Sequence, residues 1–209
     1  AQNGKSTVTH GWKPESGFLK YRWQGYDEAL LLYVLGLGSP TYPLSQDSYA
    51  AWSSTYSWAT IYGHEFVYGG PLFIHQFSHL GIDFRGIPVD YMRDKGIDYF
   101  ENSRRATYVQ QEYAIRNPLE FTGYGYNFWG LTASDGPGWV TRKIHGIERS
   151  FYSYVARGVP YGPDDGTIAP WAVIASLPFA PEIVLSTVWH LQDVYPQITG
   201  EYCLPCSFN

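Results

Sequence analysis

Two adjacent carboxylic acids, Asp27 and Glu28, stand at the start of an apolar segment and directly behind Trp23 and Tyr26. A carboxyl group enclosed by aromatic rings has a raised pKa, because burial disfavours its charged form, and it can then donate a proton near neutral pH. Acidic residues in the first turn of a helix also stabilise the helix dipole. From spacing alone this structural role is favoured, and the role of a general acid stays open as the alternative.

Two histidines, His75 and His79, are four residues apart in HQFSHL. On one face of a helix such a pair could hold a metal ion. The zinc-protease pattern HExxH is absent, since Gln76 follows His75 where that pattern has glutamate. We therefore expect histidines that form hydrogen bonds, and no metal site.

Three aspartates lie in segments that could serve either a ligand or the backbone. Asp83 and Arg85 could contact a polyhydroxylated ligand together, or form a structural ion pair. Asp135 in SDGP and Asp165 in DDGT each precede a glycine, and turn chemistry explains both segments by itself. Neither segment has the pattern GxxxxGK[ST], and the chain has no GxGxxG or GxSxG motif, so we expect no cofactor.

Helices must position most of these side chains. Hydrophobic spacing predicts helices over 27–37, 45–58, 96–117, 168–177 and 181–195, with a short helix in HQFSHL. In the third helix one stripe contains Tyr99, Asn102, Ala106, Val109 and Tyr113. Residues 119–166 show little periodicity, and long irregular stretches inside compact domains are commonly functional. Alternation with a period of two is scarce, so the predicted fold class is mainly α with long loops.

Composition narrows the class of protein. The chain has 209 residues, which suits one domain, and a net charge of −5 with no run of Lys or Arg, which argues against nucleic acid as a partner. No apolar stretch is long enough to span a bilayer, and the first residues, AQNGKS, do not resemble a signal peptide. Aromatic residues make up 18% of the chain, which suits a core with polar seams or a groove on which sugar rings stack.

The only two cysteines, Cys203 and Cys206, form a single CxxC pair near the end of the chain. A second pair that would complete a zinc site is missing, and so is the thioredoxin setting of a preceding strand and a following helix. We expect two thiols or one small disulfide in the tail.

Several long strings resemble the glycoamylase-like domain family, in the same order and over nearly the whole chain: WKPESG, GYDEALLLYVLGLGSPTYP, PLFIHQFSHLGIDFR, DYFENSRRAT, NFWGLTASDGP, DDGTIAPWAVIASLPFAPE and the terminal FN. That family includes endo-β-1,2-glucanases and part of the bacterial cyclic β-1,2-glucan synthases. The resemblance implies an (α/α)6 toroid, or the larger C-terminal part of one, with groove-lining loops. Residues 1–209 would then form a single domain.

The resemblance also implies a function and residues that carry it. It implies an inverting glycoside hydrolase acting on β-glucan, β-1,2-linked, with Glu28 as general acid. The segment 127–137 would line the groove, with Trp129 facing a sugar ring, Thr132 binding hydroxyl groups and Asp135 contacting the substrate or ordering the loop. The other groups implied to contact or support the substrate are Trp23, Tyr26, His75, Gln76, His79, Asp83, Arg85 and Asp165.

The identity of the catalytic base stays open, because the match corresponds to about half of a complete toroid. An inverting pair needs carboxyl groups about 6.5–9.5 Å apart. Asp135 or Asp165 could supply the second one, or a second chain or a homodimer could complete the fold. A glucan transglycosylase and a non-catalytic carbohydrate-binding or assembly half-domain are the alternatives. The resemblance places the polysaccharide partner, and the protein, in the periplasm or outside a bacterial cell.

Overall fold

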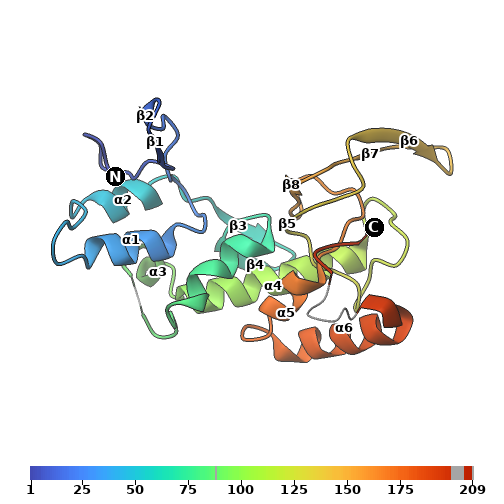
Figure 1. Cartoon of the computed structure of the whole chain (residues 1–209). Helices are drawn as coiled ribbons and strands as arrows, with labels where there is room; N and C mark the ends of the chain where they lie inside the picture. Colours follow the sequence, from blue (N-terminus) through green and yellow to red (C-terminus); the bar gives the residue numbers. More distant parts are fainter. Residues whose placement is uncertain (88, 199–204, 209) are drawn as a thin grey trace.

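The computed structural model describes residues 1–87, 89–198 and 205–208 (Figure 1). Its helices are α1 (Leu30–Leu37), α2 (Ser48–Ser53), α3 (Asp90–Asp94), α4 (Tyr99–Arg116), α5 (Pro170–Ala175) and α6 (Pro181–Val194), with short 3-10 helices η1 (Leu72–His75), η2 (Phe77–Leu80) and η3 (Pro196–Ile198). Cys203 lies outside the described residues, so the state of the cysteine pair stays a prediction.

Eight short strands form four antiparallel pairs. The pairs are β1 (Trp12–Lys13) with β2 (Gly17–Phe18), β3 (Trp58–Ile61) with β4 (His64–Val67), β5 (Ala133–Ser134) with β8 (Val155–Ala156), and β6 (Val140–Ile144) with β7 (Ile147–Phe151). In Figure 1, α1–α3 lie at one end of the molecule and α5–α6 at the other, while the β1–β2 and β6–β7 hairpins both project from the upper side.

The expectation of a mainly α toroid is wrong for this chain. Within the described residues only α1, α4 and α6 reach eight residues or more, and the segments before and between the helices contain four antiparallel strand pairs. No double ring of helices is formed by this part of the chain. The N-terminal helix is also shorter than predicted: it begins at Leu30, three residues after Asp27.

The longest helix, α4, covers nearly all of its predicted range 96–117 and begins three residues later, at Tyr99. It begins after Asp98, whose side chain accepts a hydrogen bond from the backbone N–H of Glu101 at 2.7 Å. It ends at Asn117, which adopts the left-handed conformation with φ +43° before Pro118. All five residues of the predicted stripe are buried.

Two of the hairpins turn through two-residue loops in which both residues have positive φ. Tyr62 and Gly63 have φ +50° and +84°, and His145 and Gly146 have φ +50° and +85°. Loops of this kind match the right-handed twist of the flanking strands. The β3–β4 hairpin packs on α4, because the Asn102 side chain accepts a hydrogen bond from the Val67 N–H at 2.7 Å.

The apolar side chains form two buried clusters. The first is built around Trp129, α5, α6 and the second half of α4, and the second around Tyr33, Trp52, Phe84 and Tyr99. Since α4 contributes Tyr99 to one cluster and Ala106 to the other, this helix joins the two ends of the molecule. No helix in the described part of the chain is long and apolar enough to cross a membrane.

Candidate active site

The turn before α1 holds Asp27 in a fixed position. Its Oδ1 accepts hydrogen bonds from the Ala29 N–H at 2.9 Å and from the Trp52 indole N–H at 3.2 Å. Burial raises the pKa of Asp27 to about 6, although both hydrogen bonds favour the ionised form. Asp27 therefore changes its charge closer to neutral pH than an ordinary aspartate does.

Glu28 follows in the same turn, but only its backbone is held. Ser78 in η2 donates its hydroxyl proton to the Glu28 carbonyl at 3.1 Å, and the same hydroxyl accepts from the Leu31 N–H at 3.1 Å. Among the described residues, none donates a hydrogen bond to the half-buried Glu28 carboxylate or pairs with it. The serine fixes the turn against η2 and leaves the Glu28 side chain uncommitted.

Tyrosines form a rigid aromatic layer beside this turn. The Tyr26 ring stacks on Tyr99, with centroids 5.8 Å apart and planes 2° from parallel. The Tyr99 hydroxyl lies 2.6 Å from the hydroxyls of Tyr49 and of Tyr56. Burial raises the pKa of all four groups, so the hydroxyls stay neutral and act as hydrogen-bond donors and acceptors.

Trp23, predicted to contact the substrate, is half-buried and stacks on His10 with ring centroids 4.0 Å apart. Its backbone N–H donates to the Val8 carbonyl at 2.9 Å, and its carbonyl accepts from the Tyr33 hydroxyl at 2.9 Å. These contacts tie Trp23 to the N-terminal segment.

His75 is buried under the aromatic layer, with its ring 5.1 Å from that of Tyr26. Its Nε2 lies 2.9 Å from the Gly69 carbonyl, so this nitrogen carries the proton and donates it. Burial lowers the pKa of His75 to about 4, so the ring is neutral at physiological pH. His75 supports Tyr26 and has no open face for a ligand.

His79 and Gln76 are also committed to protein partners. His79 packs its ring against Phe84 and Phe179, its Nε2 lies 3.1 Å from the Ser103 hydroxyl, and burial lowers its pKa to about 4. Gln76 donates through Nε2 to the Ala172 carbonyl and the Ser176 hydroxyl, both at 2.8 Å. In the described ranges no group of three or more His, Cys, Asp or Glu residues could hold a metal ion.

Asp83 and Arg85 form an exposed two-pronged ion pair at 2.7 Å. The hydrogen bonds from Arg85 lower the pKa of Asp83 to about 2, and the guanidinium also lies over the Phe100 ring at 5.2 Å. The pair is accessible to solvent, and the carboxylate and the guanidinium already neutralise each other.

The segment 127–137 is built into the core. Trp129 has no exposed surface, and its indole N–H donates to the Thr187 hydroxyl at 2.8 Å. Thr132 is equally buried and accepts from the Phe73 N–H at 3.1 Å. Trp129 therefore has no face for a sugar ring, and Thr132 uses its hydroxyl oxygen on the backbone.

The glycines of this segment permit close packing inside the protein. A Cβ at Gly136 would overlap the Arg157 guanidinium, and one at Gly130 would lie 2.8 Å from the Val173 side chain. Asp135 next to Gly136 is exposed, and its carbonyl accepts from the Ser207 hydroxyl at 2.6 Å. Among the groups predicted in this segment, Asp135 alone is open to solvent.

Asp165 is an anchor for the loops around β5 and β8. It binds Arg157 through two hydrogen bonds of 2.7 Å, and both side chains are fully buried. Burial alone would raise the pKa of Asp165, but the Arg157 guanidinium and the backbone donors hold it below the usual value. An aspartate bound in this way is not free to act as a base.

Its neighbour Asp164 was not singled out by sequence reasoning. The Asp164 carboxylate accepts from the hydroxyls of Tyr113 at 2.9 Å and Tyr124 at 2.7 Å, and burial raises its pKa. The signal available in the sequence was the position of Tyr113 on the stripe of the longest predicted helix. The segment DDGT thus makes two sets of contacts: Asp164 binds Tyr113 and Tyr124, and Asp165 binds Arg157.

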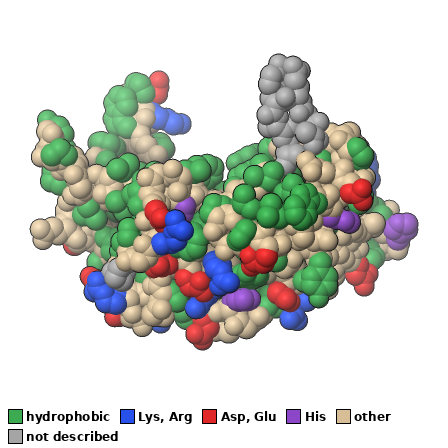
Figure 2. Space-filling model, turned by 90° about the horizontal axis from the view of Figure 1, so that it is seen from below, with side chains coloured by type: hydrophobic (Ala, Val, Ile, Leu, Met, Phe, Trp, Pro, Cys, Tyr) green, Lys and Arg blue, Asp and Glu red, His purple; other side chains and the backbone are tan. Residues whose placement is uncertain are grey.

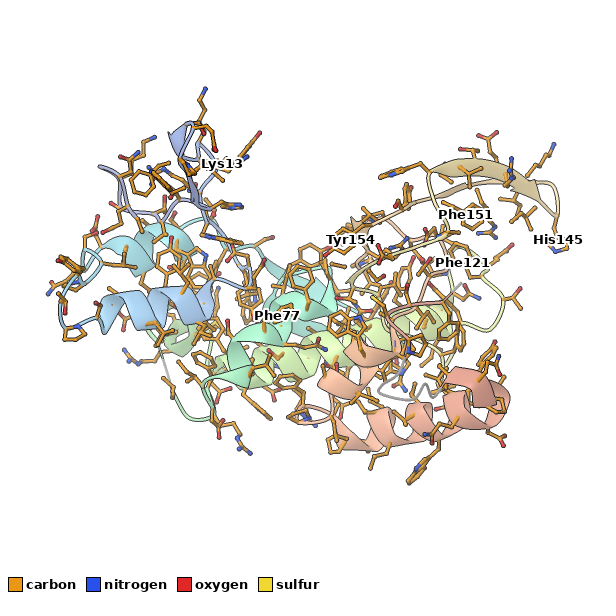
Figure 3. All side chains as sticks on the ribbon, in the orientation of Figure 1. Lys13, Phe77, Phe121, His145, Phe151 and Tyr154 are labelled. Atoms are coloured by element: carbon orange, nitrogen blue, oxygen red, sulfur yellow. The ribbon has the colours of Figure 1, made fainter. Side chains whose placement is uncertain are left out.

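Other aromatic rings are accessible, among them Tyr154 on the upper side of Figure 3. Tyr161 is 77% exposed and lies 5.6 Å from the Tyr68 ring, and Tyr154 is 64% exposed. Gly69 lies beside Tyr26, since a Cβ at Gly69 would lie 3.4 Å from the Tyr26 ring. Figure 3 shows Tyr154 on this side, between the centre of the molecule and the hairpin that ends at His145.

Comparison with known proteins shows the family of this chain. The family model Glycoamylase, described as "Putative glucoamylase", matches residues 20–209. The chain belongs to this family.

Named relatives of this Glycoamylase chain act on β-1,2-linked sugars. An exo beta-1,2-glucooligosaccharide sophorohydrolase (non-reducing end) of Parabacteroides distasonis is 28% identical over 228 residues, covering 95% of this chain and 29% of that protein. The endo-beta-1,2-glucanase of Chitinophaga pinensis, solved with sophorotriose and glucose, has a TM-score of 0.81 and 28% identity, covering 100% of this chain and 49% of that chain.

A crystal structure described as a "putative glucoamylase" from Bacteroides uniformis has a TM-score of 0.84 and 31% identity, covering 99% of this chain and 48% of that chain. The chain therefore spans about half or less of the length of these relatives.

Proposed function

We propose that this chain is part of a glycoside hydrolase that acts on β-glucan, with β-1,2-glucan as its substrate. Two relatives that match nearly the whole chain carry names of β-1,2-glucan hydrolases. The observation that carries the proposal within this chain is the Asp27–Glu28 turn, where one carboxylate is fixed and its neighbour is uncommitted beside an aromatic layer.

In the proposed mechanism Glu28 is the general acid that protonates the leaving-group oxygen. Ser78 and Asp27 hold the turn by hydrogen bonds to its backbone, so the Glu28 side chain alone would adapt to the substrate. Tyr161 and Tyr154, which are 77% and 64% exposed, would present rings to the sugar. A stacked sugar ring needs an aromatic face with polar groups at its rim, which tyrosine supplies.

Inversion requires a second carboxylate that activates water on the opposite face of the sugar. Asp165 is bound to Arg157, so Asp135, which is exposed, is the candidate within this chain. In the longer relatives, the second carboxylate could instead lie in the half of the protein that this chain does not match.

The experiment measures new reducing ends released from linear β-1,2-glucan by the wild-type chain and by Glu28→Gln. Glu15→Gln, an identical change on the exposed β1–β2 hairpin, is the matched control. We expect Glu28→Gln to lower kcat by about 100-fold or more, the usual contribution of a general acid, and Glu15→Gln to have no effect. Equal rates for wild type and Glu28→Gln would remove Glu28 from this role.

The second candidate function is a non-catalytic glucan-binding part of a larger assembly. The observation that favours it is the coverage, since the chain spans 48% of the Bacteroides uniformis structure. Calorimetric binding of β-1,2-glucan oligosaccharides, with no product after long incubation, would select this candidate. Product formation would reject it, and the anomer seen first by proton NMR would show whether the configuration is inverted.

A further inference from the structure

Residues 8–23, which we call the N-terminal ribbon, carry a row of aromatic rings on one face. In this two-stranded segment Trp12 lies directly opposite Phe18. The His10 N–H donates to the Tyr21 carbonyl at 3.0 Å, so these two residues are also neighbours across the strands. Because side chains alternate between the two faces of a strand, His10 and Trp12 lie on one face together with both partners.

The row begins beside the candidate active site and runs out into solvent. Trp23, three residues before Tyr26, stacks on His10 with ring centroids 4.0 Å apart, and the Tyr21 ring follows at 6.4 Å from that of His10. Tyr21 is 76% exposed and Trp12 is 58% exposed. The rings of the ribbon are therefore half-buried at its base and accessible toward its tip.

Hydrogen bonds hold the base of the ribbon on α1. The Tyr33 hydroxyl in α1 accepts from the Val8 N–H at 3.1 Å and donates to the Trp23 carbonyl at 2.9 Å. The Arg22 guanidinium, which alternates with the rings along the strand, donates to the Thr7 carbonyl. A surface that is already ordered loses little conformational entropy when a ligand binds to it. The ribbon thus presents its rings in a fixed arrangement.

The dimensions of this face select the kind of ligand. The ribbon is only two strands wide, and its exposed Lys13, Glu15 and Lys20 make it polar around the rings. A stable protein–protein interface takes about 20–30 residues from each partner, far more than this face offers. An extended sugar chain needs only a row of aromatic faces with polar groups at their rims, which Tyr, Trp and His supply. The face therefore suits a saccharide chain better than a protein.

The ribbon lies on the same side of the molecule as the other accessible rings. Figure 3 shows Lys13 of the ribbon and Tyr154 on this upper side. In Figure 1 the start of α1, which follows the Glu28 turn, lies between the ribbon and the β5–β8 pair. The lower face, seen in Figure 2, instead shows charged side chains of both signs interspersed. A glucan chain that lies at Glu28 and continues away from Tyr154 would reach the ribbon.

We propose that the aromatic face of the N-terminal ribbon is an outer subsite for β-glucan, in which Trp12 and Tyr21 stack on sugar units beyond those bound at Glu28. The choice of ligand rests on the proposed function. The subsite contributes affinity for long chains and takes no part in bond cleavage, because its rings carry no group that transfers a proton to the leaving oxygen. Binding at the ribbon and hydrolysis at Glu28 can therefore be measured separately.

The first experiment follows the indole N–H signals of Trp12 and Trp189 by NMR while linear β-1,2-glucan oligosaccharides are added. The titration uses the Glu28→Gln variant, so that the proposed cleavage does not shorten the ligand. Trp189 on α6 is 65% exposed and lies outside the ribbon, which makes it the matched control. We expect a saturable shift of the Trp12 signal and none of the Trp189 signal. An unchanged Trp12 signal would overturn the proposal, whether or not the wild-type chain hydrolyses the glucan.

The second experiment measures by calorimetry how much affinity the rings contribute. We expect Trp12→Ala to bind the long oligosaccharides about tenfold more weakly, and Trp189→Ala to bind like the parent protein. Trp12→Phe retains a ring and should keep most of the affinity. Trp12 is exposed, so its variants should fold, and unchanged indole signals of Trp52 and Trp129 verify this.

The outcomes separate this proposal from the proposed hydrolysis. Equal affinities of Trp12→Ala and the parent protein would overturn the subsite and leave hydrolysis at Glu28 in place. A Trp12 shift and a loss of affinity in Trp12→Ala, with no product from the wild-type chain, would support the subsite and reject hydrolysis. A Trp12 signal that responds to protein concentration and not to sugar would also overturn the subsite, because a second copy of the chain would then cover the face.

Discussion

At Asp27 and Glu28, two neighbouring carboxyl groups have different surroundings. The backbone N–H of Ala29 and the indole of Trp52 bind Asp27, whereas among the residues that the structure describes Glu28 is held through its carbonyl by Ser78. Asp27 is thus a group that shapes the turn, and Glu28 is the group left for a substrate. The distinction is testable, because the two roles respond differently to substitution and to pH.

Replacement of Asp27 by asparagine should change how stability depends on pH. In the folded chain burial raises the pKa of Asp27 to about 6 from the ordinary 3.8. Between these values the folded state holds a proton that the unfolded state has released, so this group makes the protein less stable as pH rises from about 4 to 6. The asparagine side chain of the variant can still accept both hydrogen bonds, and it carries no charge.

We therefore expect Asp27→Asn to match the wild type at pH 4 and to exceed it above pH 6, by on the order of 1 kcal/mol after allowance for partial exposure. Urea denaturation across this range measures the difference. The exposed Asp94→Asn is the control and should show no such divergence. A uniform loss of stability in Asp27→Asn at every pH would contradict this account.

At the scale of elements, the two hairpins with positive-φ loops differ in what they contact. The β3–β4 hairpin buries Ile61, Phe66 and Val67 against α4, whereas β6–β7 buries only Phe151 at its end. The same turn geometry thus serves a hairpin in the core and a hairpin on the surface. The difference predicts whether backbone strain introduced in each turn destabilises the whole fold or the hairpin alone.

Gly63→Ala and Gly146→Ala place a side chain in nearly identical strained conformations, with φ +84° and +85° and no heavy atom within 4 Å of the added Cβ. Each change costs about 1 kcal/mol in its turn. We expect Gly63→Ala to lower the global denaturation midpoint, because its hairpin is part of the core. Gly146→Ala should leave the midpoint unchanged and only speed hydrogen exchange in β6 and β7. Equal shifts of the midpoint would show that the β6–β7 hairpin is coupled to the core.

The sequence predicted α4 well and the hairpins poorly. The α4 stripe from Tyr99 to Tyr113 repeats at helical spacing, is long, and has a polar cap at one end and Asn117-Pro118 at the other, so local signals agree. The strands are two to five residues long, too short for alternation to register. The dipeptides Tyr62-Gly63 and His145-Gly146 were the remaining signals, since glycine accepts positive φ.

At the scale of the whole molecule, α4 connects the two buried clusters. Trp52 belongs to one cluster and donates its indole proton to Asp27, while Trp129 belongs to the other and donates to Thr187. Because one continuous helix supplies residues to both, loss of either cluster removes packing that holds this helix in place for the other. The two ends should then unfold together.

The prediction is that the indole N–H signals of Trp52 and Trp129 disappear at the same urea concentration in NMR spectra, as in a two-state transition. Assignment by Trp→Phe variants identifies each signal. Two separate midpoints would show that the clusters fold independently and that α4 is only a tether between them. As an internal control, the two urea midpoints are measured again in the presence of a β-1,2-glucan oligosaccharide.

The sequence by itself determined the family, the buried helix α4, the absence of a nucleotide-binding motif and the carboxylate pair before α1. These features can be recognised from the spacing of nearby residues or from long segments of sequence typical of the family. Only the tertiary structure decided that Trp129 and Thr132 are core residues, that Asp165 is bound to Arg157, and that the fold carries strand pairs instead of a ring of helices. The reason is that burial and pairing depend on residues far apart in the chain, such as Trp129 with Thr187, and no local pattern records those contacts.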